Sequence, residues 1–244
     1  MKKEHLITGV VIIVVWWAIA ISINNDVLIP TPLNVVDSLV KISTNLNSYV
    51  ATYKTILRVF EGYFISLLLA LIISVFANRI PLIRSLFEPV QSLAKAIPNI
   101  SYIIITLIWL GSEGSVSVIC CLVLFPVFYN NFQFTLDSEP QELKDIEKIY
   151  PEEFIKTVKL RTLPLLFDNI LSTSKTTLGL GLKIVVMAEI LGQVKVGIGK
   201  QLHIARLYLN TADLFAWTII IILVSVIIDS IFDYLIKIKE EKWC

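Results

Sequence analysis

Residues 142–164 read ELKDIEKIYPEEFIKTVKLRTLP, and they form the one long, strongly charged segment of a mostly apolar chain. The segment lies between two apolar blocks and ends in Leu163-Pro164. Pro151 divides it, because proline suits the first position of a helix and disrupts a helix interior. The sequence therefore predicts two short helices, joined by a turn, at one face of a larger apolar fold.

The second of these helices has the stronger support. Glu152 and Glu153 would lie at its N-terminus, where the helix dipole favours negative charge. Glu152 and Lys156 are four residues apart in the favourable order, and Phe154 and Val158 can anchor its apolar side. We expect a stiff helical projection, although a solvated loop without a binding partner fits the same residues.

The composition indicates a membrane protein. Hydrophobic residues make up 56 % of the 244 residues, charged residues make up 17 %, and the mean hydropathy is +0.77. Soluble globular chains are about half apolar and about a quarter charged. The formal net charge of +1 gives no reason to expect a nucleic-acid partner. The cysteines and histidines show no metal-ligand spacing, and the adjacent Cys120 and Cys121 are expected to pack as small apolar residues.

The apolar blocks predict an all-α membrane protein with about six transmembrane helices. The expected spans are residues 6–23, 56–77, 116–134, 172–191 and 214–236, with a third span that includes residues 100–110. Residues 82–98 fit either an interfacial helix or the start of this third span. The third span must use part of residues 88–99, because the clearly apolar run 100–110 is too short to cross a bilayer. We interpret the first block as an uncleaved span, although Ala18-Ile19-Ala20 resembles a signal-peptidase site. Residues 111–114 predict a tight turn.

Charge placement predicts the orientation of the chain. With the N-terminus inside, thirteen of the 21 lysines and arginines fall in inner segments and six in outer segments or span edges. The positive-inside rule then predicts that both termini lie in the cytoplasm. Residues 1–55 would hold the first span and an external amphipathic segment whose helix starts at Pro32. Residues 56–244 would form the transmembrane core, with a cytoplasmic loop at 137–169 between the fourth and fifth spans.

Several ionisable residues fall within the expected spans, where they are costly and usually functional. Arg58 and Glu61 are three apart and could pair on one helix face. Lys183 and Glu189 are six apart and project about 120° from each other, so they are not expected to pair. Lys183 fits either a transport pathway for an anionic or polar solute or a pairing with another span or an interface. For Glu189, near the outer end, a gate or a structural pairing is favoured.

The charged segment resembles the cytoplasmic EAA loop of ABC-transporter permeases. In that motif Glu-Ala-Ala is followed after three residues by glycine, and thirteen residues later by proline. Asp145, Ile146 and Glu147 stand at the Glu-Ala-Ala positions, Pro151 stands at the glycine, and Leu163-Pro164 at the closing Leu-Pro. The spacing is kept, whereas the residues have diverged.

Other short motifs resemble permeases of the nitrate, taurine and sulfonate type, and they occur in the same order from residue 28 to the C-terminus. Thr55, Arg58 and Gly62 resemble the TxxRxxxG pattern that opens that family's second span. Residues 188–192 (AEILG), followed by residues 197–199 (GIG), resemble AEMLG…GLG. Further matches are Ile29-Pro30-Thr31-Pro32, Glu88-Pro89, Ala96-Ile97-Pro98, Ile108-Trp109-Leu110-Gly111 and Phe125-Pro126.

The resemblance implies the permease subunit of an ATP-driven importer in the cell (inner or plasma) membrane. Two permease subunits, expected to be a homodimer in the lipid bilayer, would form the pathway for a small polar or anionic solute or vitamin precursor. Two cytoplasmic ABC ATPases would bind the loops, and an external binding protein would deliver the solute. The residues expected to couple to the ATPase are Asp145, Glu147, Pro151, Phe154, Lys156, Lys159, Leu163 and Pro164. The candidates for the pathway or a gate are Lys183, Glu189 and Gly192.

No catalytic site, metal site or cofactor is expected in this chain. The phosphate-binding loop GxxxxGK[ST] is absent, so ATP and Mg would be held by the partner ATPase. A secondary transporter and an intramembrane enzyme are the alternative functions. The first often shows an inverted repeat, and the second would need paired acids or a His, Cys and Ser set within the spans. The sequence shows neither feature.

Overall fold

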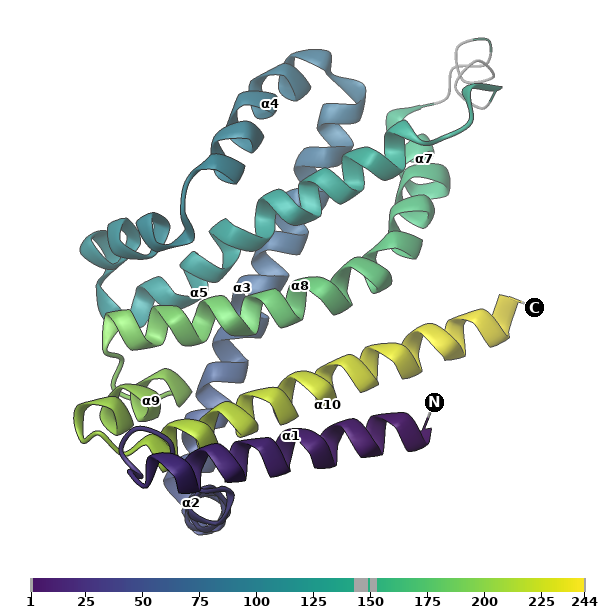
Figure 1. Ribbon diagram of the computed structural model, residues 1–244. Coiled ribbons are helices and arrows are strands. Elements are labelled where there is room, and N and C mark those ends of the chain that lie inside the picture. The colour runs from purple at the N-terminus through teal and green to yellow at the C-terminus, as the bar shows by residue number, and fades with distance from the viewer. Residues whose placement is uncertain (1, 143–148, 150–152, 244) are drawn as a thin grey trace.

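The structure is a computed structural model that describes residues 2–142, 149 and 153–243, and this part of the chain contains helices and no strand. In chain order the elements are α1 (Lys2–Ile23), α2 (Pro32–Thr44), α3 (Leu46–Arg79), α4 (Pro81–Ala96), α5 (Asn99–Asp137), α7 (Phe154–Thr157), the π-helical turn η1 (Val158–Thr162), α8 (Leu163–Gly192), α9 (Ile198–Leu207) and α10 (Thr211–Trp243). Figure 1 shows α5, α8 and α10 running in similar directions, with α3 crossing them. The predicted all-α fold is confirmed.

Helices α3, α5 and α8 form the core, because each presents small and apolar side chains to the other two. The largest fully buried apolar side chains of α5 and α8 are Ile103, Ile119, Leu124, Phe128, Phe132, Leu136, Leu166, Leu178 and Leu182. Tyr63 of α3 packs edge-on against Phe128 with 5.4 Å between ring centroids, and its hydroxyl forms a hydrogen bond with Ser174 of α8. Cys120 and Cys121 are buried as expected.

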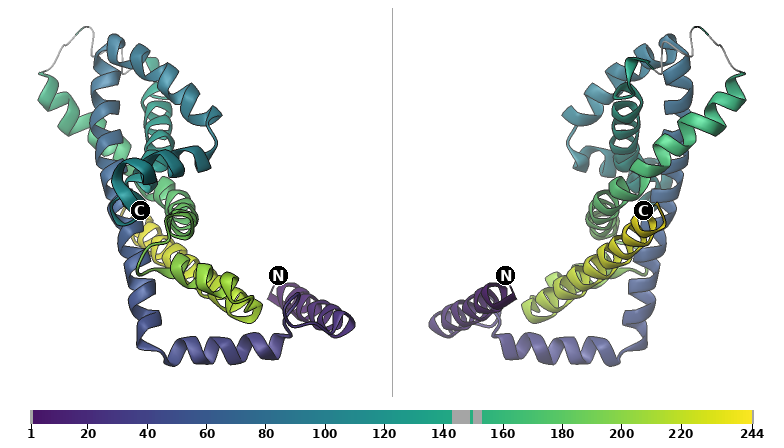
Figure 2. Two further views of the ribbon diagram at one scale, coloured as in Figure 1. Left: turned by 90° about the vertical axis from the view of Figure 1, so that its left-hand side faces the viewer. Right: turned by 90° about the vertical axis from the view of Figure 1, so that its right-hand side faces the viewer.

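Helix α1 lies apart from this core and is joined to it through α2 (Figure 2). Pro32 is in the first turn of α2, as predicted, and Thr31 caps its N-terminus. Val35, Ser38 and Ile42 are the buried side of α2, which packs against α10. Trp16 of α1 stacks on Phe215 of α10 at 5.4 Å between ring centroids.

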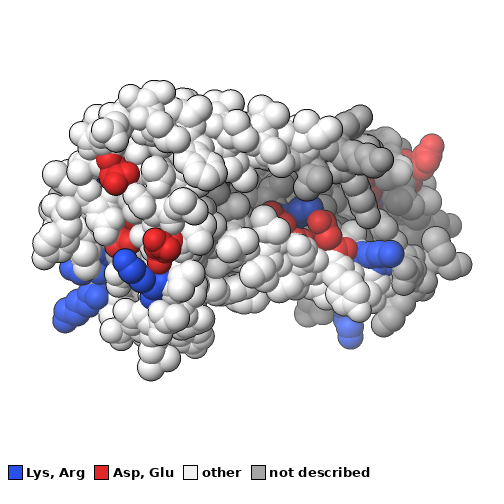
Figure 3. Space-filling model, turned by 60° about the horizontal axis from the view of Figure 1, so that its bottom comes forward, with Lys and Arg blue, Asp and Glu red and all other residues white. Residues whose placement is uncertain are grey.

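Three helices within the described residues are long and apolar enough to cross a membrane. They are α3, α5 and the Thr211–Ile238 part of α10, and Ile7–Ile23 of α1 is a shorter apolar helix. On the face shown in Figure 3, charged side chains gather in separate groups with uncharged surface between them. Large hydrophobic side chains such as Phe64, Leu68 and Ile222 are exposed on these helices, which suits lipid rather than water. The chain is therefore a multi-pass membrane protein.

The region of the expected third span is divided between two helices. Helix α4 ends at Ala96 and α5 begins at Asn99, so Ile97 and Pro98 interrupt the helix. Ile97 has φ −78° and ψ 125°, which is an extended conformation. The residue before a proline is disfavoured in the helical region, and the proline itself lacks an N–H for the helical ladder.

Helix α5 also contains a break, at Gly111, where φ is 70° and ψ is 178°. Glycine adopts this region without the steric cost that a side chain would impose. The expected tight turn over residues 111–114 is thus reduced to a single residue, because the chain is helical again from Ser112. The part of α5 after the break contains the expected fourth span, with Pro126 inside the helix.

Gly62 sets the closest approach between α3 and α5. A Cβ atom at this position would lie 2.5 Å from Cys120 Cβ and 2.7 Å from the Ser117 carbonyl oxygen. We expect Gly62→Ala to lower the free energy of unfolding by about 1–3 kcal/mol, because overpacking forces the helices apart. Thermal unfolding in detergent measures the change. Gly114→Ala is the control, since its Cβ would meet nothing within 4 Å. Equal Tm values for the two variants would contradict the packing described here.

Candidate functional site

The carboxylate of Glu189, near the end of α8, is completely buried and fully hydrogen-bonded. Arg58 Nη1 of α3 donates to its Oε1 at 2.6 Å, and Thr55 Oγ1 lies 2.9–3.0 Å from both carboxylate oxygens. The backbone N–H of Gly199, at the start of α9, donates to Oε2 at 2.9 Å. One carboxylate therefore joins α3, α8 and α9, and we call Thr55, Arg58, Glu189 and Glu113 the outer cluster.

Arg58 and Thr55 extend the outer cluster to the loop between α8 and α9. Arg58 Nη1 also donates to the Val196 carbonyl oxygen at 2.8 Å, and Nη2 lies 2.5 Å from Glu113 Oε2 of α5. Glu113 in turn accepts a hydrogen bond from the backbone N–H of Lys195 at 2.6 Å. The loop after α8 is therefore held by side chains of both α3 and α5.

Two glycines allow the loop to approach this carboxylate. A Cβ at Gly197 would lie 2.6 Å from the carboxylate atoms of Glu189, and a Cβ at Gly199 would lie 2.4 Å from Glu189 Cβ. No other residue leaves this space open. At Gly192 a Cβ would meet only the far end of the Leu107 side chain, at 2.7 Å. The steric requirement at Gly192 is therefore weaker.

The structure gives Arg58 a different partner from the one expected. Sequence spacing suggested a pair with Glu61, but Glu61 accepts a hydrogen bond from Ser117 Oγ at 2.6 Å and Arg58 turns to Glu189. The physical reason is burial, since Glu189 has no access to solvent and needs the cation, whereas Glu61 is exposed. The sequence did contain an indication of this pair. Arg58 belongs to the motif at 55–62 and Glu189 to the motif at 188–199, and these two motifs meet here.

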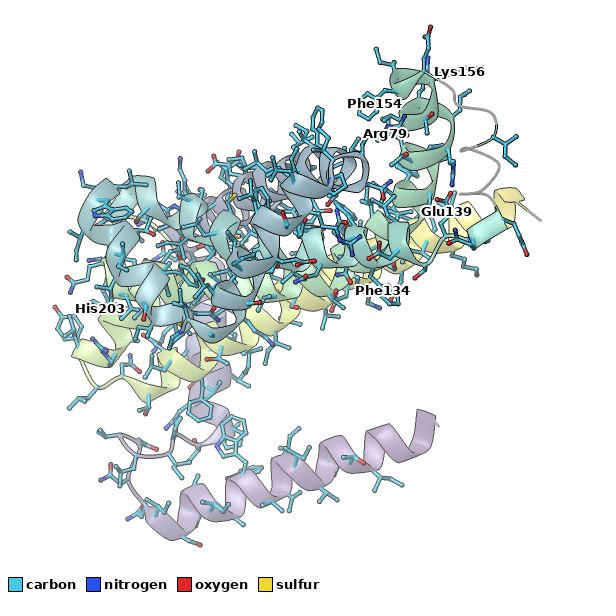
Figure 4. The ribbon with its side chains drawn as sticks, turned by 90° about the horizontal axis from the view of Figure 1, so that it is seen from above. Arg79, Phe134, Glu139, Phe154, Lys156 and His203 are labelled. Carbon is cyan, nitrogen blue, oxygen red and sulfur yellow. The ribbon has the colours of Figure 1, made fainter. Side chains whose placement is uncertain are left out.

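The described end of the charged segment, residues 153–164, lies at the opposite end of the molecule. Figure 4 shows Phe154 and Lys156 far from His203, which belongs to α9. Phe154 stacks on Phe76 of α3 with 5.9 Å between ring centroids. Arg161 forms an ion pair with Glu139, which follows α5. These contacts place α7 and η1 against the C-terminal ends of α3 and α5.

The exposed side of this segment is both apolar and basic. Ile155 is 76 % exposed and Leu160 is 63 % exposed, and Lys156 and Lys159 are also exposed. Exposed apolar side chains next to basic ones are typical of a protein-binding surface. We call residues 154–160 the docking segment. Asp145, Glu147 and Pro151 lie outside the described residues.

Leu163 and Pro164 form the first turn of α8. The sequence predicted a loop to residue 169 and a span from Ser172, but residues 163–192 are one helix. The Leu163 N–H bonds to the Val158 carbonyl oxygen, five residues back. This π-turn shifts the hydrogen-bond ladder just before the proline, which lacks its own donor. The helical chain therefore runs without interruption from the docking segment to Glu189.

Lys183 and Glu189 do not pair, as expected, because they lie on different sides of α8. Lys183 is exposed, whereas Glu189 is buried. No ion pair or hydrogen bond of the Lys183 side chain is present within the part of the chain that the structure describes. That part also holds no group of His, Cys, Asp and Glu side chains suited to a metal ion.

The outer cluster generates a prediction about stability. Arg58→Met should cost about 3–5 kcal/mol, because it leaves the buried Glu189 carboxylate without its cation. Arg58→Met combined with Glu189→Met should cost clearly less than the sum of the single changes. A double-mutant cycle in detergent, with exposed Lys54→Met as the control, measures this coupling. Additivity within about 0.5 kcal/mol would show that the pair does not interact.

The chain is similar in sequence to two known transport proteins along most of its length. The chain is 24 % identical over 243 residues to a Bacillus subtilis (strain 168) protein named as an aliphatic sulfonates transport permease, SsuC, covering 98 % of this chain and 87 % of that protein. It is 21 % identical over 230 residues to the taurine transport system permease protein TauC of Escherichia coli (strain K12), covering 91 % and 83 %. No family model matches the chain.

The fold resembles that of a solved transporter chain. A chain of the MetNI methionine ABC transporter, in an inward-facing conformation, superposes with a TM-score of 0.66 at 14 % identity, covering 78 % of this chain and 94 % of that chain. A second crystal form of the same transporter gives a TM-score of 0.60. The chain is therefore similar to the permease proteins of ABC importers along nearly its whole length, and it shares the fold of a solved ABC-transporter chain.

Proposed function

We propose that this permease imports a small organic anion and is driven by cytoplasmic ATPases that bind the docking segment. The observation that carries the proposal is the uninterrupted helical run through α7, η1 and α8. Residues 154–192 would extend about 58 Å at the α-helical rise. A push on the docking segment would therefore reach the membrane interior along one helix. The ATP and Mg belong to the ATPases.

The arrangement of the chain supports six spans with both termini in the cytoplasm. In Figure 1 the start of α1, the end of α10 and α7 lie toward the same end of the molecule, and α9 lies toward the other. The spans would be α1, α3, the interrupted pair of α4 with the first part of α5, the second part of α5, α8 and α10. Helix α9 and the outer cluster then face an external binding protein that delivers the solute.

The exposed side of α8 supports a homodimer with a polar pathway. Ser172, Thr176 and Lys183 are exposed on one side of this helix, which otherwise packs into the core. Polar and charged side chains within a span face a protein partner or a water-filled cavity rather than lipid. A second copy that presents the same side would enclose a pathway between the two α8 helices.

The solute class follows from the relatives and from Lys183. The relatives are named for aliphatic sulfonates and taurine, which both carry an anionic sulfonate. An ammonium group exposed to a pathway attracts an anion and repels a cation. We therefore assign Lys183 to the pathway, and we assign the choice among individual anions to the external binding protein.

The docking segment can be tested by charge reversal. Lys156→Glu together with Lys159→Glu should weaken binding of the transporter's ATPase at least about tenfold, as for changes at the centre of an interface. The measurement is co-purification of the ATPase with the detergent-extracted permease. Lys41→Glu with Lys54→Glu, at the other end of the molecule, is the matched control. Unchanged ATPase binding and unchanged uptake in the first variant would refute the assignment.

The role of Lys183 can be tested with one variant that removes its positive charge and another that keeps the charge on a different side chain. Lys183→Met should reduce uptake of an anionic solute by about tenfold, whereas Lys183→Arg should retain most of it, because a charge in a low-dielectric pathway is worth about 1.4 kcal/mol or more. Uptake into membrane vesicles that contain the whole transporter provides the measurement. Equal loss in both variants would indicate a packing role instead.

A further inference from the structure

The loop between α8 and α9, residues 193–197, is held in place by side chains of other helices. The Val196 carbonyl oxygen accepts a hydrogen bond from Arg58 Nη1 at 2.8 Å, and the Lys195 N–H donates to Glu113 Oε1 at 2.6 Å. These side chains come from α3 and α5, and the loop itself is neither helix nor strand. Its position therefore depends on these contacts rather than on a backbone ladder of its own.

The Glu113 carboxylate joins this loop to Arg58. Its Oε2 atom lies 2.5 Å from Arg58 Nη2, and its Oε1 atom accepts the Lys195 N–H. We call these two contacts the Glu113 bridge. Because one side chain makes both contacts, a movement of Glu113 breaks the ion pair and frees the loop backbone at the same time.

The two carboxylates that contact Arg58 differ in burial. The side chains of Glu189 and Arg58 are 0 % and 8 % exposed, whereas the side chain of Glu113 is 47 % exposed. A buried charge that loses its partner stays uncompensated, but an exposed carboxylate exchanges its partner for water. Arg58 therefore keeps Glu189 when one of its two ion pairs breaks, and the Glu113 bridge is the contact that can open.

Non-helical backbone lies close to both sides of the Glu113 bridge. Gly111, two residues before Glu113, has a φ of 70°, and a Cβ at Gly111 or Gly114 would meet nothing within 4 Å. On the side of the loop, Gln193 follows α8 in the left-handed conformation, with φ 48° and ψ 49°. Hinges are formed by a few residues at the ends of elements, which absorb changes in φ and ψ. A hinge position is thus available next to each partner of the bridge.

We propose that Glu113 is a positioning residue for solute entry. Its carboxylate holds the loop at the outer end of α8, and the Glu113 bridge opens when the solute enters, while the Arg58–Glu189 pair stays closed. The loop follows directly on the helix that carries Lys183, so it lies at the outer entrance of the proposed pathway. The proposal rests on the proposed function, because it assigns the outer end of the molecule to solute entry.

Hydrogen exchange compares two contacts of the same region. The Lys195 N–H is bound to Glu113, and the Gly199 N–H is bound to Glu189. In the whole transporter with its ATPases, in lipid nanodiscs, an ATP analogue that is not hydrolysed should speed exchange at Lys195 at least about tenfold and leave Gly199 protected. Equal changes at the two amides, or no change at Lys195, would overturn the proposal.

Two substitutions at Glu113 show which contact holds the loop. Glu113→Ala should speed exchange at Lys195 about tenfold without nucleotide, because a hydrogen bond to a charged group is lost. Glu113→Gln keeps an acceptor for this N–H and loses the ion pair, so the increase should be smaller. Glu61→Ala, which removes an exposed carboxylate that contacts Ser117, is the matched control. Exchange at Lys195 that is the same in Glu113→Ala and Glu61→Ala would show that Glu113 does not hold the loop.

A reversible cross-link decides whether the Glu113 bridge has to open. Glu113→Cys and Lys195→Cys would be joined by a short bifunctional thiol reagent, in a chain whose three native cysteines are replaced by alanine. Uptake of methanesulfonate into proteoliposomes that contain the whole transporter should fall at least about tenfold and return after reduction. Each single-cysteine variant with the same reagent should keep its uptake. Full uptake with the cross-link in place, or no cross-link although both cysteines react, would refute the proposal.

A second cross-link controls for stiffening of the outer end in general. Asp26→Cys with Thr211→Cys joins two outer segments that are in contact, away from the loop after α8, and should leave uptake unchanged. Equal inhibition by both cross-links would reject a specific role of Glu113. An absence of methanesulfonate uptake in the unmodified transporter would count against the proposed import, whereas exchange at Lys195 and Gly199 would still decide on the Glu113 bridge.

Discussion

The fold depends on the neutralisation of one buried carboxylate. Glu189 has no solvent exposure, and a lone charge in that environment would cost several kcal/mol. Arg58 supplies the opposite charge from α3, and Thr55 and the Gly199 backbone supply the remaining hydrogen bonds. Each donor comes from a different place in the chain, so the carboxylate is satisfied only when α3, α8 and α9 are assembled together.

At the opposite end of the molecule one of the ion pairs is exposed to solvent. Arg84 forms two hydrogen bonds with Asp137, at 2.7 and 2.8 Å, but both side chains are more than 40 % exposed. Exposed ion pairs contribute about 0–1 kcal/mol, well below the cost of breaking a buried pair. The Arg84–Asp137 pair therefore adds little to the hold between the start of α4 and the end of α5. The part-buried Arg161–Glu139 pair and the stack of Phe154 on Phe76 are the stronger contacts at this end.

Much of the fold could be predicted from composition and proline placement. The all-α class, the start of α2 at Pro32 and the burial of Cys120 follow from local rules. The interruption at Pro98 was hidden, because residues 88–110 had to be joined to reach a bilayer-spanning length. The Arg58–Glu189 pair was also missed, since helical spacing reports neighbours on one helix and cannot report contacts between helices 131 residues apart in sequence.

Helix α8 connects the buried Glu189–Arg58 pair with the docking segment. Its C-terminal end is held by the pair of Glu189 with Arg58, and its N-terminal end continues into the docking segment. Between them, Leu180 lines a cavity of about 460 Å³ that is also lined by the end of α4 and part of α5. A helix fixed at one end and pushed at the other changes its distance to neighbours most on the pushed side. The chain at Ile97-Pro98, which also lines this cavity, lacks a continuous hydrogen-bond ladder and therefore yields more easily than an intact helix would. The cavity is thus the place in the core whose shape would respond most to motion of the docking segment.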